Sequence, residues 1–112
     1  MNKVISVKVT NLRKLGYDNI REWLEDETNI YIGRGLRIFI NKKPFYIKQS
    51  KWRNPFIVKE HGRENCILLY EEWIMKSGLI NDIEELRNKT LGCWCKPDKC
   101  HGDILVKYDK IH

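Results

Sequence analysis

Short β-branched runs alternate along this chain with stretches whose apolar residues recur at helical spacing, and this alternation most constrains the fold. The predicted order is strand, helix, strand, hairpin, helix, helix, strand and helix. In residue numbers, the strands cover 3–9, 29–33 and 89–95, the hairpin covers 36–48, and the helices begin near 18, 63, 81 and 102. Strands that alternate with helices predict a sheet containing parallel pairs, with helices on both faces.

The expected fold is therefore a small three-layer α/β domain, Rossmann-like, in which helices cover a mixed, partly parallel sheet. The hairpin over 36–48 is expected as an insertion. In sheets of this kind, ligands bind beyond the carboxyl ends of the strands. Gly33-Arg34-Gly35 follows one predicted strand, and the segment from Cys95 to His101 follows another. We therefore expect the two segments to meet at one edge of the sheet.

Local signals predict where several helices begin and end. Asp18 is expected to cap the first helix, because a short acidic side chain can accept the free N–H groups there. Gly78 is expected to end the helix that begins near Arg63. Asn81 followed by Glu84 resembles a capping box for the next, shorter helix.

The chain has 112 residues, the size of one domain, and we expect residues 1–112 to form a single unit. It contains no apolar run near the length of about 20 residues that a membrane-spanning helix needs. The first residues also lack the pattern of a secretory signal. We therefore expect a cytoplasmic protein with no membrane partner, whose 4 cysteines are reduced thiols or metal ligands.

Positive charge is concentrated in the middle of the chain. The formal net charge is +6, and the stretch from Thr28 to Lys59 contains no Asp or Glu. Its basic residues are Arg34, Arg37, Lys42, Lys43, Lys48, Lys51, Arg53 and Lys59. Such a block favours a polyanionic partner, which could be a nucleotide, another phosphorylated small molecule or a nucleic acid. The alternative is a solvated basic surface that only keeps the protein soluble.

Three cysteines and a histidine fall close together near the C-terminus, in Leu91-Gly-Cys-Trp-Cys-Lys-Pro-Asp-Lys-Cys-His-Gly-Asp103. Cys93 and Cys95 lie on the predicted last strand, where we expect them on the same face. Cys100 and His101 fall at the turn into the last helix. Free N–H groups and the helix dipole at such a turn favour an anion or a thiolate.

This cluster allows two kinds of chemistry. In the first, a thiol with a depressed pKa attacks an electrophile or His101 activates water, and the candidate catalytic residues are Cys100, His101 and Asp103. In the second, zinc binds to Cys93, Cys95, Cys100 and His101. We do not favour a metal from the spacing, which differs from that of ordinary zinc ribbons and fingers. Cys93 is also explained as a small core residue.

Candidate ligand-binding residues mix cations, aromatic rings and an amide. Arg34, between two glycines, could hold a phosphate or stack on a base. The segment from Trp52 to Phe56 combines stacking surface with polar donors, which suits unstacked bases. The predicted ligand-binding residues are Arg34, Trp52, Arg53, Asn54, Phe56, Arg63 and Lys96.

Assembled, these motifs resemble a known family. They are Tyr31-Ile-Gly-Arg-Gly35, Ser50-Lys-Trp-Arg-Asn-Pro-Phe56, Arg63 ahead of a Tyr-bearing helix, Glu85-Leu-Arg-Asn-Lys89 and the cysteine segment. From about Tyr31 to Leu105 the chain resembles Domain of Unknown Function 4326, common in phages, giant viruses and some microbes. The resemblance implies a small α/β domain of viral or phage type. If the protein is viral, we expect it in the host cytoplasm. The resemblance brings no established activity. Matching positions are Arg34, Asn54, Phe56, Arg63, Cys95, Cys100, His101 and Asp103.

The sequence therefore predicts a basic and aromatic cleft beside a Cys-His turn that binds a phosphate-bearing nucleotide or nucleotide-derived molecule. In a virus or phage, such a cleft could process or sequester its ligand. One alternative is a Cys/His-dependent nucleotide hydrolase or transferase. Another is a zinc-stapled nucleic-acid-binding module. The cleft hypothesis requires Arg34 and His101 to open onto the same hollow.

Overall fold

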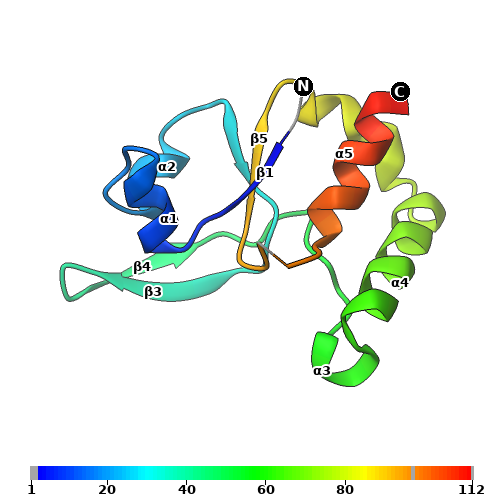
Figure 1. Ribbon diagram of the computed structural model, residues 1–112, viewed down its shortest axis with the longest axis horizontal. Helices are drawn as coiled ribbons and strands as arrows, with labels where there is room; N and C mark the ends of the chain where they lie inside the picture. The colour runs from blue at the N-terminus through cyan, green and yellow to red at the C-terminus, as the bar shows by residue number, and fades with distance from the viewer. Residues whose placement is uncertain (1–2, 97, 112) are drawn as a thin grey trace.

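The computed structural model describes residues 3–96 and 98–111 and contains two β-sheets (Figure 1). One is a parallel sheet with the strand order β1 (Lys3–Ser6), β5 (Thr90–Cys93), β2 (Asn29–Tyr31). The other is an antiparallel hairpin of β3 (Leu36–Ile40) and β4 (Lys43–Ile47). Parallel and antiparallel strands are both present, as predicted, and the structure divides them between two sheets.

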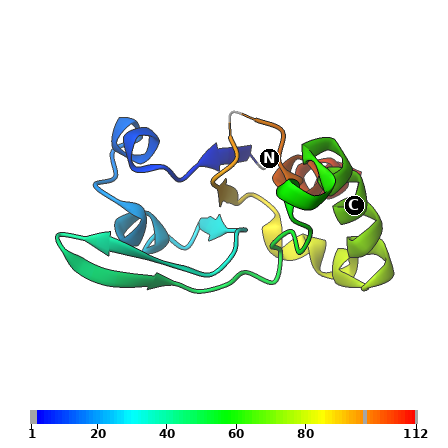
Figure 2. The ribbon, with the colours of Figure 1, turned by 90° about the horizontal axis from the view of Figure 1, so that it is seen from below.

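Helices lie on both faces of the parallel sheet. They are α1 (Val9–Lys14), α2 (Ile20–Leu24), α3 (Val58–His61), α4 (Arg63–Lys76), the 3-10 helix η1 (Leu79–Leu86) and α5 (His101–Ile111). Successive strand residues point to opposite faces. Val4, Ile30 and Leu91 join the core beneath α4, η1 and α5, whereas Ile5 and Tyr31 join a second core with α1, α2 and the hairpin. Figure 2 shows the hairpin extending toward the side of α1 and α2, away from α4 and α5.

The central strand β5 is apolar because both of its faces are covered. Leu91 pairs with Val4 of β1 on one side and with Ile30 of β2 on the other. At Gly92, an added Cβ would lie 2.4 Å from the Trp23 ring. Glycine at this position therefore lets Trp23 pack directly on the strand.

Several local predictions are confirmed. The helix predicted from Arg63 to Lys76 is α4, and Gly78 follows it in the left-handed conformation with φ +80°. The predicted hairpin is present, and Asn41 and Lys42, with φ of +52° and +66°, make the two-residue turn between β3 and β4. Positive φ at both central residues matches the right-handed twist of the flanking strands.

The first strand is shorter than predicted, and a helix follows it. The strand ends at Ser6 because its partner β5 ends at Cys93, which lies opposite. The chain has no ladder partner beyond the bond from Val7 N–H to the Cys93 carbonyl, and Val9 begins α1. The β-branched residues at the end of this run favour a strand. They do not form one because the neighbouring strand β5 offers no further backbone partner.

Two predicted caps are wrong. The first of these helices, α2, is capped by Asn19 rather than Asp18, and the Asn19 side chain accepts the Glu22 N–H at 3.0 Å. The predicted capping box at Asn81 does not form, since η1 begins at Leu79 without a side-chain cap. Helix α3 was not predicted. Among the described residues, no helix is long and apolar enough to cross a membrane.

Candidate functional site

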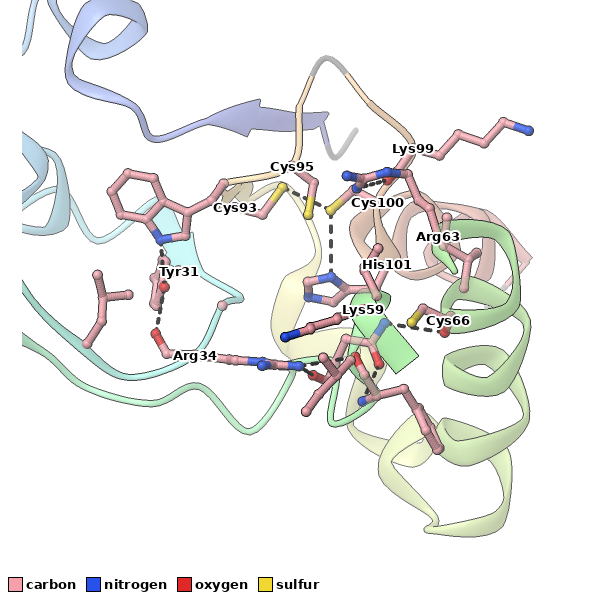
Figure 3. A pocket seen from close by; sticks show the side chains of 18 of the residues that line it. Tyr31, Arg34, Lys59, Arg63, Cys66, Cys93, Cys95, Lys99, Cys100 and His101 are labelled. Carbon is pink, nitrogen blue, oxygen red and sulfur yellow. Dashed lines mark hydrogen bonds between the residues drawn. The ribbon is translucent and has the colours of Figure 1, made fainter. Parts of the chain in front are cut away.

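A pocket of about 530 Å³ lies beyond the carboxyl ends of β2 and β5 (Figure 3). Its walls come from the segment after β2, the loop before α3, the first turns of α4 and α5, and the segment after β5. The volume is in the range of small-molecule sites. Arg34 and His101 both line this pocket, so the two segments that the sequence predicts to meet do meet.

Arg34 is held in place at the end of β2 by its neighbours. The Tyr31 hydroxyl donates to the Arg34 carbonyl oxygen at 2.6 Å. A Cβ at Gly33 would lie 2.5 Å from that hydroxyl, so glycine makes room for the fold-back. The Arg34 Nη2 atom donates to the carbonyl oxygens of Asn54 at 3.3 Å and Phe56 at 3.1 Å. The guanidinium thus joins the end of β2 to the opposite wall of the pocket.

The Asn54 amide is also used within the protein. Its oxygen accepts the Phe56 N–H at 3.0 Å, and its nitrogen donates to the Cys66 carbonyl at 3.3 Å. These bonds shape the loop before α3 and tie it to α4. The Phe56 ring packs edge-on against His61, with centroids 5.9 Å apart. Asn54 and Phe56 line the pocket, and Asn54 also builds its wall.

The charged side chains among the described lining residues of the pocket are basic. Arg34, Lys59, Arg63 and Lys99 are among its described lining residues, which include no Asp or Glu. Carboxylates approach two of these cations only loosely from outside, Asp98 at 3.8 Å from Arg63 and Glu64 at 3.8 Å from Lys99. Such exposed pairs at long distance contribute little. The pocket therefore has a net positive potential.

The thiols of Cys93, Cys95 and Cys100 form a cluster in one wall. Their Sγ atoms all lie within 4.8 Å of one another, and those of Cys93 and Cys100 are 2.9 Å apart. Cys93 and Cys100 are buried, and Cys95 is partly buried. The prediction that Cys93 and Cys95 share one strand is wrong, because β5 ends at Cys93 and the chain bends after it.

Cys100 caps helix α5. Its Sγ accepts the Gly102 N–H at 3.3 Å, and its own N–H donates to the Asp103 carboxylate at 3.2 Å. This reciprocal pair is a capping box with a thiol in place of a hydroxyl. Lys96 closes the loop by pairing with Asp103 at 2.6 Å. A Cβ at Gly102 would lie 2.9 Å from both Ile32 and Val4, so glycine lets the helix start close to the sheet.

His101 is buried beside this cluster. Its Nε2 atom lies 2.7 Å from the Ile32 carbonyl oxygen, which only accepts, so Nε2 carries the proton. Nδ1 is then an acceptor, 3.6 Å from the Cys100 Sγ. Burial lowers the pKa of His101, although the bond to Ile32 opposes this. The imidazole is therefore neutral near pH 7, and its edge packs on Tyr70 with centroids 4.9 Å apart.

The three thiols differ in acidity. Hydrogen bonds from Cys100 and Cys93 to the Cys95 sulfur place the pKa of Cys95 well below its usual range, and Arg63 adds to this effect. The pKa of Cys100 is raised, because its bonds to Cys93 and Cys95 favour the protonated thiol and because it is buried. The cluster therefore loses its first proton at Cys95. If the helix N-terminus alone controlled thiol acidity, Cys100 would lose its proton first.

Four predicted site residues lie outside the pocket lining. Trp52 is a core residue, 3% exposed, and its carbonyl oxygen accepts the Tyr70 hydroxyl at 2.7 Å. Arg53 lines a separate hollow. Lys96 and Asp103 pair with each other at the start of α5.

The pocket also contains residues that the sequence did not single out for it. They are Tyr31, Lys59, Trp94 and Lys99, together with the apolar side chains of Ile57 and Val58 at the start of α3. Trp94 Nε1–H donates to the Tyr31 hydroxyl at 2.9 Å, which joins the segments after β5 and β2. Two sequence signals could have found them: Lys59 ends the acid-free stretch, and Trp94 separates two cysteines of the cluster.

The fold and this site define a small α/β domain with a basic pocket that is walled on one side by three thiols. The chain belongs to the family described as Domain of unknown function (DUF4326), which matches residues 17–110. The family resemblance expected from the sequence is thus confirmed, over a longer stretch than predicted.

Two relatives come from viruses. "Uncharacterized protein R718" of Acanthamoeba polyphaga mimivirus is 36% identical over 92 residues, which are 74% of this chain and 68% of that protein. "Uncharacterized 12.4 kDa protein in nrdA-td intergenic region" of Enterobacteria phage T4 is 43% identical over 61 residues, which are 49% of this chain and 56% of that protein. No solved structure matches the chain.

Proposed function

We propose that the pocket binds a phosphate-bearing nucleotide or nucleotide-derived molecule. The observation that carries this proposal is the lining, in which four cations occur with no carboxylate among the described residues. Cations with no carboxylate beside them in the lining favour an anionic ligand, and arginine suits phosphate because it can donate two parallel bonds. Arg63 in the first turn of α4 and His101 at the start of α5 line the same pocket.

The other half of the lining suits a base. Phe56, Ile57, Val58 and Leu36 give apolar surface in the lining, and Trp94 adds an indole ring. Aromatic and apolar surface packs against the faces of unstacked bases. A ligand with a flat apolar part and a phosphate at one end would match both halves of the pocket.

The Rossmann-like character predicted for the domain is part of this proposal. Doubly wound α/β proteins bind nucleotides beyond the carboxyl ends of parallel strands, where helix N-termini face the phosphates. The pocket occupies the corresponding place after β2 and β5. In the viral or phage context of the two relatives, the protein would sequester or process the nucleotide. A zinc ion on the thiols is compatible with this role, because the cationic side of the pocket stays free.

A thermal-shift experiment at low ionic strength tests the proposal. The panel pairs nucleoside mono- and diphosphates and a dinucleotide with the matching nucleosides and inorganic phosphate. We expect a phosphate-bearing member to raise the melting temperature and its nucleoside to leave it unchanged. Lys59→Ala, inside the pocket, should weaken the effect, whereas Lys14→Ala in α1 should not. No stabilisation by any nucleotide would contradict the proposal.

A Cys/His-dependent hydrolase or transferase is the enzymatic alternative. It is favoured by one observation: Cys95 lines the pocket with a lowered pKa, next to Arg63. A thiolate at neutral pH is the reactive form of cysteine. Product analysis on a nucleotide that binds distinguishes the two functions. Turnover that is lost in Cys95→Ser, with binding retained, would establish the enzyme.

Nucleic-acid binding is a second candidate, favoured by the outer face of the hairpin. Phe39 and Tyr46 are 63% and 69% exposed there, and the Arg37 guanidinium lies 5.4 Å from the Phe39 ring centroid. Exposed rings among cations suit single-stranded nucleic acid. Fluorescence anisotropy with a labelled oligonucleotide over a salt series tests this candidate. Phe39→Ala should weaken binding, and the affinity should fall steeply with salt.

A further inference from the structure

We propose that Cys93, Cys95 and Cys100 bind one zinc ion, with its fourth coordination position facing the pocket. The three thiols come from two segments, the end of β5 with the bend after it and the start of α5. Their sulfur atoms all lie within 4.8 Å of one another. The zinc site does not depend on a nucleotide, so its experimental test is independent of the test of the function proposed above.

The spacing of the sulfurs suits one zinc ion. Zinc–sulfur bonds are near 2.3 Å, which places two sulfurs on a tetrahedral zinc about 3.8 Å apart. Three sulfurs within 4.8 Å of one another meet this requirement after small side-chain rotations. Cys93 and Cys100, at 2.9 Å, would move apart. Thiolates are soft ligands that select zinc over the hard cations magnesium and calcium.

The surrounding contacts hold the ligands in place. Asp103 accepts the Cys100 N–H and pairs with Lys96, which fixes both ends of the loop between the cysteines. The Gly102 N–H donates to the Cys100 sulfur, and the Arg63 side chain donates to the Lys99 carbonyl oxygen just before Cys100. Donors of this kind stabilise metal-bound thiolates from outside the coordination sphere. These contacts hold Cys100 in place at the start of α5.

The charge balance also favours the metal. Three thiolates and one zinc ion carry a net charge of −1, in a wall that is largely buried. The pocket supplies compensating cations nearby in Arg34, Lys59, Arg63 and Lys99. The cations therefore stabilise the loaded site and leave an overall positive pocket for an anionic ligand.

The fourth position faces the pocket because the three cysteines line it. The His101 imidazole lies beside the cluster, but among the described residues the group of ligand atoms that all lie within 4.8 Å of one another contains only the three cysteines. Its Nε2 is held by the Ile32 carbonyl, and its Nδ1 lies 3.6 Å from the Cys100 sulfur. Water or a ligand therefore completes the coordination. An open position is typical of zinc sites that act on ligands.

Metal analysis of the full chain tests the three ligands. The protein is purified under reducing conditions without a histidine tag, and zinc is measured by mass spectrometry of the elements. We expect one zinc per chain. Cys93→Ser, Cys95→Ser and Cys100→Ser should each lower zinc affinity by more than about 100-fold, beyond what loss of an outer contact costs. Cys66→Ser is the matched control, since Cys66 lines the same pocket outside the cluster.

Cobalt substitution tests the coordination without relying on the variants to fold. Cobalt-loaded wild-type protein should show sulfur-to-metal charge-transfer absorption and the intense visible bands of a tetrahedral site. Added imidazole should shift the visible bands, because it enters an open position. Bands that do not respond would overturn the open position. Sub-stoichiometric zinc, equal loss in Cys66→Ser, or a Cys93–Cys100 disulfide in freshly reduced protein would overturn the site.

Discussion

The Nε2 atom of His101 lies 2.7 Å from the carbonyl oxygen of Ile32, so the first residue of α5 is joined to the segment that follows β2. This bond fixes the tautomer of the imidazole and turns Nδ1 toward the Cys100 sulfur. The two residues come from chain segments far apart in sequence, and the bond between them joins the start of α5 to the segment that leads into Arg34.

Loss of this bond should destabilise the fold. In His101→Ala the Ile32 carbonyl loses its partner in a buried place, and the ring leaves a cavity beside Tyr70. An unsatisfied buried polar group costs about 1–3 kcal/mol, and the cavity adds to this. We expect the free energy of unfolding to fall by about 3 kcal/mol in urea titrations. His61→Ala, an exposed histidine in α3, is the control and should change it by less than about 0.5 kcal/mol.

The free energy of unfolding should also decrease in mild acid, because His101 binds a proton more readily in the unfolded chain. Burial lowers its pKa in the folded state relative to about 6.5 in the unfolded chain. The unfolded state therefore binds the proton more readily, so the stabilising effect is complete above about pH 6.5 and is lost as pH falls toward the folded pKa. Urea titrations across this range measure the slope. His101→Gln should flatten it, and an unchanged slope in that variant would assign the effect to another group.

Cys95 should be the most reactive thiol of the metal-free protein. Its pKa is lowered by hydrogen bonds from Cys100 and Cys93, whereas the pKa of Cys100 is raised. At about pH 6, well below the usual thiol pKa near 8.5, iodoacetamide should label Cys95 first. Peptide mapping by mass spectrometry identifies the labelled site. Faster labelling of Cys100 would show that the helix N-terminus controls thiol acidity here.

Asp103 should contribute to stability through the start of α5. Its carboxylate accepts the Cys100 N–H and pairs with Lys96. Asp103→Ala removes both contacts and should cost about 1 kcal/mol, the usual value of a cap. Asp98→Ala is the matched control, because Asp98 is exposed and lies 3.8 Å from its cationic partner. Equal effects of the two substitutions would remove the capping role.

The sequence predicts those elements whose causes are local. The spacing of Ile67, Tyr70 and Ile74 indicates α4, and Gly78 ends it with a positive φ. The meeting of Arg34 and His101 also follows from the sequence, because parallel strands bring their carboxyl ends to one edge of a sheet. Residue order alone was enough for that prediction.

Other features depend on contacts between distant segments, which residue order does not reveal. The first strand stops at Ser6 because β5 ends opposite it. Trp52 stands among basic residues in the sequence, yet it is buried and its carbonyl is bonded by Tyr70. The Cys95 sulfur lies close to the Cys100 sulfur because the chain bends after β5. The sequence pattern there indicates a continuous strand, so it does not reveal the bend.

The most direct test of the nucleotide pocket is an NMR titration of the labelled protein with a nucleotide that stabilises it. The account predicts that the amide signals that shift belong to Arg34, to Phe56 through Arg63, and to Cys93 through His101, with the corresponding nucleoside binding far more weakly. Shifts confined to the β3–β4 hairpin, or equal binding of nucleotide and nucleoside, would contradict it.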